Sequence, residues 1–271
     1  MNLSTKALTQ IPPIVALDGD KIAVSGSVRD IHAWLKADNI RRSTAFIIHD
    51  PCGCLLKRYR NVLSQNGYGI KVFDTTCGAK SARYNPFSYL RDSGGVRELA
   101  DAVLRGTQGN GGGDDDYGFL LAEWLLLRTL FGYIHENAIE DEMNFNTALE
   151  MIKNMEIVED WDGYKTAVDY MFESLETRDP FDATALRYKY FKTTPYAKGN
   201  ELLESCAERL APLVTKQALD LLSQDELCFN EWSYSKTALF VRTDVNCSHL
   251  KFITPLMYSQ FFGTAYEQAV Q

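Results

Sequence analysis

The sequence predicts an α/β fold that is interrupted by a large all-helical insertion. In the first 74 residues, short apolar runs alternate with helical segments, which is typical of parallel strands joined by right-handed helical crossovers. From residue 96 to about residue 222, the apolar positions follow a helical period instead. An apolar run at residues 236–242 then returns the chain to the α/β pattern.

The strands predicted in the first part are short and rich in β-branched and aromatic residues. They occupy residues 21–24, 44–49 and 69–74. A turn of small residues at 25–27 follows the first strand and leads into a helix around residues 31–35. A second helix is expected at residues 55–64, because Asp50-Pro51 ends the preceding strand and Asn66-Gly67 stops the helix. The three strands are expected to lie parallel in one sheet.

The middle of the chain is predicted to be helical throughout. Its helices are expected at residues 96–104, 117–136, 146–155, 161–173, 183–191 and 199–222. Asp182 and either Asn144 or Asn146 are the expected N-caps. The glycine- and aspartate-rich residues 106–116 are expected to form a flexible surface loop.

The domain boundaries follow from these changes of pattern. Residues 1–95 and 223–271 are predicted to form the α/β domain, which ends in an aromatic-rich helix at residues 249–267. Residues 96–222 are predicted to form the inserted helical domain. Within it, residues 117–134 are strongly apolar but contain Glu123 and Arg128, and this favours a buried core helix over a membrane span.

Composition limits the function classes. The chain has 271 residues, and 45% of them are hydrophobic, which is enough to bury a core. Its 36 acidic residues outnumber its 28 basic ones, so that the net charge is −8 and the pI about 5.1. Lys and Arg drive binding to DNA phosphates, so this balance excludes a surface that is basic throughout. The basic residues at 41–42 and 57–60 are interpreted as solvated helix faces and ends.

The cysteines indicate a reduced, cytoplasmic protein. Six cysteines stand at positions 52, 54, 77, 206, 228 and 247, with no regular spacing. Residues 1–13 lack the charged start and apolar run of a secretory signal. The Cys-x-Cys pair at residues 52–54 does not have the usual spacing of a zinc site, and no metal is predicted there.

A phosphate-binding loop is the first candidate site. P-loop proteins hold phosphate where a strand turns into a helix, with backbone N–H groups around the anion and a Lys and a Ser or Thr beside it. Here the turn contains Ser25, Gly26, Ser27 and Arg29, and no Gly-Lys-Ser/Thr follows. Asp30 adds a negative charge near the place where a phosphate would sit. The alternative interpretation is an ordinary strand–helix turn.

Several segments resemble a known family in their order along the chain. They are Phe-Ile-Ile-His-Asp-Pro at residues 46–51, residues 67–73, Arg-Tyr-Asn-Pro-Phe-Ser-Tyr-Leu-Arg-Asp at 83–92, and residues 205–212, 236–241 and 257–262. This arrangement resembles the TraG-like coupling proteins of conjugative type IV secretion, from about residue 22 to the end of the chain. In that family a strand ends in Asp-Pro-Lys-Gly-Glu, and an Arg-Tyr-Asn-Pro segment follows the next strand.

The resemblance implies a fold and an activity. Members of the family are membrane-anchored, usually hexameric ATPases that move single-stranded DNA or protein into a secretion channel. They have a RecA-like P-loop NTPase domain with an all-helical domain inserted, so the resemblance implies a partial RecA-like sheet here. Asp50 matches the first residue of the family's Asp-Pro-Lys-Gly-Glu and is a candidate nucleotide-binding residue, whereas Cys52 and Cys54 replace its Lys and Glu.

The departures from the family pattern predict a protein that does not hydrolyse ATP. The P-loop Lys and Ser/Thr are absent, and the acidic strand that holds magnesium would lie beyond Gln271. Phosphoryl transfer depends almost entirely on positioning and charge stabilisation, which these residues supply. We therefore expect no catalytic residue and no resident cofactor, with magnesium–ATP as the alternative. The family's transmembrane anchor is also not found in this chain.

The expected role is binding within a type IV secretion or mobile-element system in bacteria. The expected partners are other secretion or relaxosome proteins and further copies of the chain, at the cytoplasmic face of the membrane. Two alternatives remain: a nucleotide-binding subunit whose site a partner chain completes, and a protein-interaction module built on the helical insertion. Single-stranded DNA is expected to bind only weakly, independently of sequence and with strong salt dependence.

Overall fold

The computed structural model describes two compact units. They comprise Met1–Tyr84 with Gln224–Gln271, and Asn85–Ser223. The residues whose structure is described are 14–18, 21–25, 45–76, 81–107, 117–156, 164–232, 235–243 and 250–270. The second unit is therefore inserted into the first along the chain, with its junctions at residues 84–85 and 223–224, where the sequence placed them at 95–96 and 222–223.

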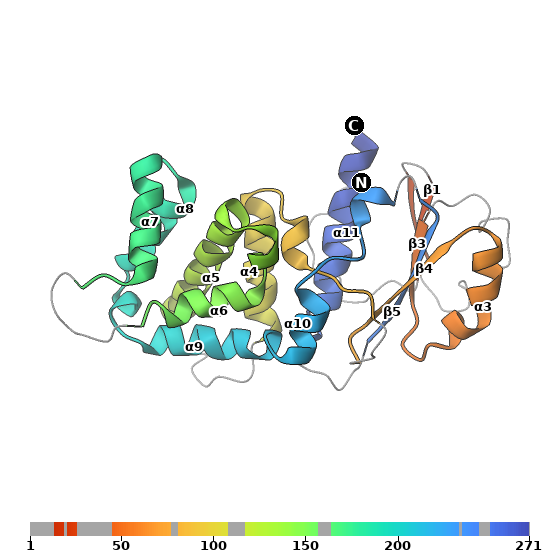
Figure 1. The fold of residues 1–271 in the computed structure, drawn as a ribbon, viewed down its shortest axis with the longest axis horizontal. Helices are drawn as coiled ribbons and strands as arrows, with labels where there is room; N and C mark the ends of the chain where they lie inside the picture. Colours follow the sequence, from red (N-terminus) through yellow and green to blue (C-terminus); the bar gives the residue numbers. More distant parts are fainter. Residues whose placement is uncertain are drawn as a thin grey trace. The chain divides into compact units, whose positions relative to one another are not determined.

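The first unit contains a five-stranded sheet (Figure 1). Its strands are β1 (Ile14–Asp18), β2 (Lys21–Ser25), β3 (Ala45–His49), β4 (Gly69–Asp74) and β5 (Thr237–Arg242). Their order across the sheet is β2-β1-β3-β5-β4. Strands β3, β5 and β4 are parallel, whereas β1 is antiparallel to both β2 and β3. The unit is therefore α/β with three adjacent parallel strands, as the sequence predicted for residues 44–49, 69–74 and 236–242.

The first predicted strand was expected to lie parallel to the other two in one sheet, and its pairing partner was predicted wrongly. Strand β2 forms at the expected residues, but it pairs with β1, an additional strand that the sequence analysis did not identify. Only residues 19 and 20 separate the paired Asp18 and Lys21, and a connection of two residues can join antiparallel strands but not parallel ones. The helix predicted at residues 31–35 lies outside the described residues.

The core of the first unit lies on both faces of the parallel strands. Phe46 and Ile48 of β3 and Phe240 of β5 are fully buried and pack against α3 (Cys54–Gln65), which contributes Leu55, Tyr59 and Leu63. Figure 1 shows α3 on one side of the sheet and α11 (Ile253–Val270) on the other. Residues 45–48 are buried without alternation, which is expected for a strand covered on both faces.

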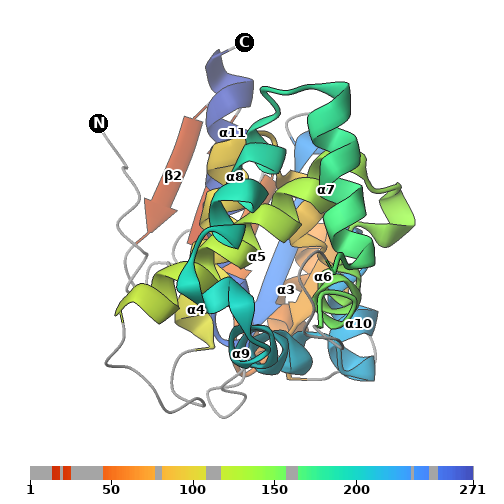
Figure 2. The same cartoon turned by 90° about the vertical axis from the view of Figure 1, so that its left-hand side faces the viewer.

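Seven α-helices form most of the described part of the second unit. They are α4 (Ser93–Gly106), α5 (Tyr117–Asn137), α6 (Phe145–Lys153), α7 (Ala167–Arg178), α8 (Ala183–Lys192), α9 (Glu201–Leu210) and α10 (Lys216–Leu222). Asn144 and Asp182 cap α6 and α8 by accepting hydrogen bonds from the first backbone N–H groups, as predicted. Helix α5 packs against α4, α6, α8 and α9 and is the central helix of this unit (Figure 2).

Two helix predictions in this unit were wrong. The single helix expected at residues 199–222 is divided into α9 and α10 by the 3-10 turn Ala211–Leu213. Pro212 has no N–H to continue the α-helical ladder, and Thr215 then caps α10 through its hydroxyl. Helix α7 begins at Ala167 rather than at residue 161, because Thr166 and Asp169 form a reciprocal capping box at that point.

The apolarity of α5 results from its place in the core. Among the described helices, α5 alone is long and apolar enough to cross a membrane, with a mean hydropathy of 1.2 in its most apolar window. However, 56% of that window is buried inside the protein, as for a core helix. Its Glu123 is fully buried and binds Arg209 of α9 at 2.8 Å. The apolar residues of α5 therefore form the centre of the helical unit, as the sequence predicted.

Candidate ligand site at the carboxyl ends of the parallel strands

The three parallel strands end side by side, and their last residues are polar. Strand β3 ends at His49, β5 at Arg242 and β4 at Asp74, with β5 in the middle. In open α/β sheets, ligands bind in the crevice outside the carboxyl ends of the strands. This edge of the first unit is therefore its candidate ligand site.

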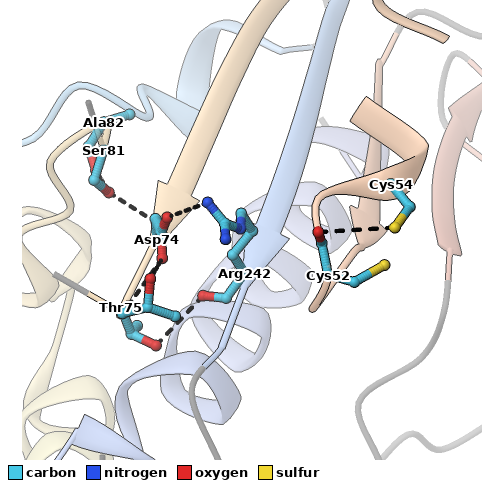
Figure 3. A network of polar contacts seen from close by, with 8 residues as sticks. Cys52, Cys54, Asp74, Thr75, Ser81, Ala82 and Arg242 are labelled. Atoms are coloured by element: carbon cyan, nitrogen blue, oxygen red, sulfur yellow. Dashed lines mark hydrogen bonds and ion pairs between the residues drawn. The ribbon is translucent and has the colours of Figure 1, made fainter. Parts of the chain in front are cut away.

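Asp74 and Arg242 form the centre of this edge (Figure 3). They are register partners on neighbouring strands, and Nη1 of Arg242 donates to Oδ2 of Asp74 at 2.8 Å. The other carboxylate oxygen, Oδ1, accepts hydrogen bonds from the backbone N–H and the hydroxyl of Thr76, at 2.9 and 2.6 Å. Asp74 is buried, whereas the side chain of Arg242 remains 37% exposed. The guanidinium group is thus the part of this pair that a ligand can reach.

Arg242 retains unused hydrogen-bonding capacity. Its Nε is buried and has no hydrogen-bond partner within the described residues. The guanidinium lies over Gly53, where an added Cβ would be 3.5 Å from Nε. Gly53 has φ +68°, a left-handed conformation that glycine adopts without the steric cost of a side chain. Glycine therefore supports both the turn and the position of Arg242.

Asp50 has a structural role at the start of α3. It is 1% exposed, and its carboxylate accepts hydrogen bonds from the N–H groups of Leu55 and Leu56, at 3.2 and 2.8 Å. These are donors that the first turn of a helix leaves unpaired, and the negative charge also complements the helix dipole. Its own N–H donates to Val241 of β5 at 2.8 Å. Asp50 thus connects β5 to the beginning of α3, and both carboxylate oxygens are used within the chain.

Cys52 lies in the turn before α3 and Cys54 is the first residue of α3, and both are exposed free thiols (Figure 3). The thiol of Cys54 lies 3.8 Å from the carbonyl oxygen of Cys52. Its hydrogen bond with Cys52 raises the pKa of Cys54 above its ordinary value, so the unreactive thiol form is favoured. Within the described part of the chain, no three His, Cys, Asp or Glu side chains gather as a metal-binding group.

His49 predicts a pH dependence of stability. Burial lowers its pKa below the ordinary value of 6.5, although Asp50 opposes this shift, and Nε2 shares a 3.1 Å hydrogen bond with the hydroxyl of Thr243. The unfolded chain therefore binds a proton at His49 at a higher pH than the folded chain does. The contribution of neutral His49 to the free energy of unfolding is expected to be complete above pH 6.5. It is expected to be lost as the pH falls toward the lowered pKa of the folded state.

Urea unfolding near pH 7.5 and near pH 5.5, in the wild type and in His49→Gln, measures this effect. The loss of stability between the two values is expected to be smaller in His49→Gln. Equal losses in the two proteins would exclude His49 as the cause.

The predicted phosphate loop is only partly described by the structure. Ser25 is the last residue of β2, in register with Ile14 of β1, which in turn pairs with Ile48 of β3. Ser25 therefore lies at the same edge of the sheet as Asp50. Strand β1 stands between β2 and β3, so the two strands are two inter-strand spacings apart, or roughly 10 Å. Gly26, Ser27 and Arg29 lie outside the described residues. Of the predicted loop, the structure therefore places Ser25 alone, one strand away from β3.

The sequence analysis missed Asp74 and Arg242. Each is the last residue of a strand that was correctly predicted, and they carry opposite charges. The sequence therefore contained a usable signal, because the carboxyl ends of parallel strands meet at one edge. The pairing of the two strands was the missing information, since β4 and β5 are separated by the whole helical unit.

Comparison with known proteins assigns no family to the chain. No protein-family model matches it, and a search of curated proteins gives no significant match.

Proposed function

We propose that this chain is a non-hydrolysing binding component of a conjugative type IV secretion system, built on a coupling-protein-like RecA domain with an inserted helical domain. The observation that carries the proposal is the state of the two buried carboxylates at the carboxyl edge. Asp50 caps α3 with both oxygens, and Asp74 binds Arg242 and Thr76. Neither is available to hold magnesium or to activate water, the roles that ATP hydrolysis requires.

Two further features support a relationship to the coupling proteins. The Arg-Tyr-Asn-Pro segment at residues 83–86 stands at the junction where the helical unit begins. Within the first unit, Arg83 forms a 2.7 Å ion pair with Glu226, and Tyr84 packs against Phe73 and Phe229. Inside the helical unit, Asn85 contacts the backbone near the opposite junction at Ser223. A segment with these roles is expected wherever this kind of insertion occurs.

The helical unit supports a binding role. Four large apolar side chains of α7, α8 and their connection are exposed: Tyr170 (60%), Phe181 (85%), Leu186 (45%) and Tyr190 (64%). Leu186 and Tyr190 are one turn apart on α8 and therefore neighbours, and contiguous exposed apolar surface marks protein-interaction sites. In a secretion machine, the partner would be another transfer protein.

Steady-state phosphate release from magnesium–ATP tests the absence of hydrolysis. The wild-type chain is expected to show no turnover above the protein-free background, because the side chains that stabilise the transferred phosphoryl group are missing. The control is Arg242→Ala, which removes the exposed cation of the edge and leaves the hydrogen bonds of Asp50 to α3 in place. Turnover in the wild type that Arg242→Ala abolishes would refute the proposal.

A second candidate function is nucleotide binding without hydrolysis, in a site completed by a partner chain. The part-exposed guanidinium of Arg242 at the carboxyl edge favours this alternative. A ligand at about one hundred times its Kd adds roughly 2.7 kcal/mol of stability. A thermal-shift titration with magnesium–ATP, with phosphate alone as the control, therefore separates the two functions. A rise in Tm of several degrees that Arg242→Ala removes supports the nucleotide-binding alternative.

A further inference from the structure

The helical unit contains two arginines that have no carboxylate partner. Arg128 lies on α5 and Arg187 on α8, and both are half-buried. No ion pair joins either of them to an acidic side chain within the described residues. The closest polar contact of Arg187 is a weak hydrogen bond, 3.4 Å long, from Nη1 to the hydroxyl of Thr184. Half-buried charges are normally paired, because desolvation without a partner is costly.

The side chain of Arg187 reaches the face of α5 that also carries Arg128. The guanidinium of Arg187 rests against Gly132, where an added Cβ would be only 3.1 Å from Nη1. Arg128 is four residues before Gly132 and therefore on the same face of α5. Burial and then the positive charge of Arg128 both lower the pKa of Arg187. The two cations are thus near enough to repel each other.

Two buried nitrogen atoms on this face of α5 have no hydrogen-bond partner among the described residues. Nε of Arg128 is buried without a hydrogen-bond partner, and so is Nδ1 of His135, which lies seven residues further on. The guanidinium of Arg128 otherwise stacks on Trp124, with Cζ 5.2 Å from the ring centroid. The positive charge of Arg128 is therefore stabilised by an aromatic ring and not by an acidic side chain among the described residues.

The neighbouring carboxylates do not neutralise the two arginines. Glu136 and Asp182 both raise the pKa of Arg187, and Glu136 bonds to the same Thr184 hydroxyl that Nη1 of Arg187 contacts. Glu136 accepts a hydrogen bond from the hydroxyl of Thr184 at 3.2 Å. Asp182 caps α8 through the N–H groups of Thr184 and Ala185, at 2.9 and 2.7 Å. The two acids therefore offset part of the positive charge of Arg187, but neither forms an ion pair with it among the described residues.

We propose that Arg128 and Arg187 form a binding site for a phosphate group on the helical unit. A phosphate oxyanion accepts several hydrogen bonds at once, and arginine guanidinium groups match its geometry with two parallel N–H donors. Such an anion would accept hydrogen bonds from the two half-exposed guanidinium groups and would offset the repulsion between the two cations. This site is independent of the edge that contains Asp74 and Arg242, so it does not depend on the proposed function.

Thermal unfolding of the full chain in inorganic phosphate, against chloride at equal ionic strength, tests the site. Phosphate is expected to raise the Tm of the wild type. Arg187→Gln is expected to have a Tm in chloride that equals or exceeds that of the wild type, because it removes an unpaired half-buried charge. In the same variant, the apparent Kd for phosphate should rise about tenfold or more, as for the loss of a charge-assisted hydrogen bond.

Two further variants keep the result interpretable. Arg105→Gln removes an equal charge from an exposed arginine that is paired with Asp101, and it should leave phosphate binding unchanged. Gly132→Ala keeps all charges but should displace the Arg187 guanidinium and weaken phosphate binding. The proposal is overturned if phosphate has no effect beyond chloride, if Arg187→Gln responds to phosphate as the wild type does, or if Arg105→Gln weakens phosphate binding as much as Arg187→Gln.

The source of the phosphate is distinguished by repeating the titration with a short single-stranded oligonucleotide. If the oligonucleotide competes with inorganic phosphate, and if this competition is lost in Arg187→Gln, the phosphates of a nucleic acid are ligands of this site. Phosphate binding without competition identifies a small phosphate compound instead. Oligonucleotide binding that Arg187→Gln leaves intact lies elsewhere on the chain and counts against nucleic acid as the ligand here.

Discussion

Replacing Arg209 with methionine is expected to lower the free energy of unfolding by about 3–5 kcal/mol, because it leaves the fully buried carboxylate of Glu123 without its partner. In the wild type, Nε and Nη2 of Arg209 bind the two carboxylate oxygens of Glu123, each at 2.8 Å. Ser205, one turn earlier on α9, donates its hydroxyl to the same carboxylate. The carboxylate is therefore compensated entirely by the segment at residues 205–209.

The double variant Glu123→Leu/Arg209→Met separates the cost of an orphaned charge from the value of the pair. Replacing both partners by apolar residues of similar size removes the desolvation cost of two ions, and this often restores or increases stability. We expect the double variant to recover most of the loss. Thermal unfolding is the measurement, and the single variant should lower Tm by roughly 10 °C. If the free energy of unfolding of Arg209→Met were within about 1 kcal/mol of the wild-type value, Glu123 and Arg209 would not form a buried ion pair that the fold depends on.

Replacing Asn85 with alanine is expected to destabilise the helical unit by roughly 2–4 kcal/mol, because three hydrogen bonds of a buried side chain are lost. Oδ1 of Asn85 accepts from the N–H of Phe87 at 3.0 Å and caps the 3-10 helix Pro86–Tyr89. Nδ2 donates to the carbonyl groups of Met143 and Ser223, at 2.8 and 3.3 Å. A single amide thus holds together the first and last residues of this unit.

Two matched variants define the contribution of Asn85. Asn85→Asp keeps the capping oxygen but loses the N–H donors to the two carbonyl groups, so it should be almost as unstable as Asn85→Ala. Asn154→Ala removes an exposed amide that bonds within its own helix end, to Glu150, and should cost well under half as much. Urea unfolding provides the comparison. Equal effects of Asn85→Ala and Asn154→Ala would show that closing the unit is not the role of Asn85.

Both variants lie in segments on which the resemblance to coupling proteins rests. Asn85 belongs to the Arg-Tyr-Asn-Pro segment, and Ser205 and Arg209 belong to residues 205–212. Their structural contacts give a physical reason for these residue types, without any contribution from nucleotide chemistry. A stable inserted unit would need them whether or not the protein hydrolyses ATP.

The sequence by itself determined the elements that depend on local pattern. Strands β3, β4 and β5 and the helices α3, α4, α5, α6 and α8 follow from apolar periodicity together with capping and turn residues, such as Asp182 and Gly67. These signals act within a few residues, so they can be read without knowing which segments meet. The same signals failed where a local feature was overlooked, as at Pro212, which divides α9 from α10.

Only the tertiary structure decided which residues stand together. Strand β5 lies between β3 and β4, although the helical unit separates it from both along the chain, and this pairing brings Arg242 to Asp74. Likewise, the packing of α8 on α5 places Arg187 beside Arg128, and that of α9 on α5 places Arg209 beside Glu123. Periodicity shows that a face is buried, but not what covers it. Pairings over such distances in sequence depend on the packing of the whole core, which leaves no local signal.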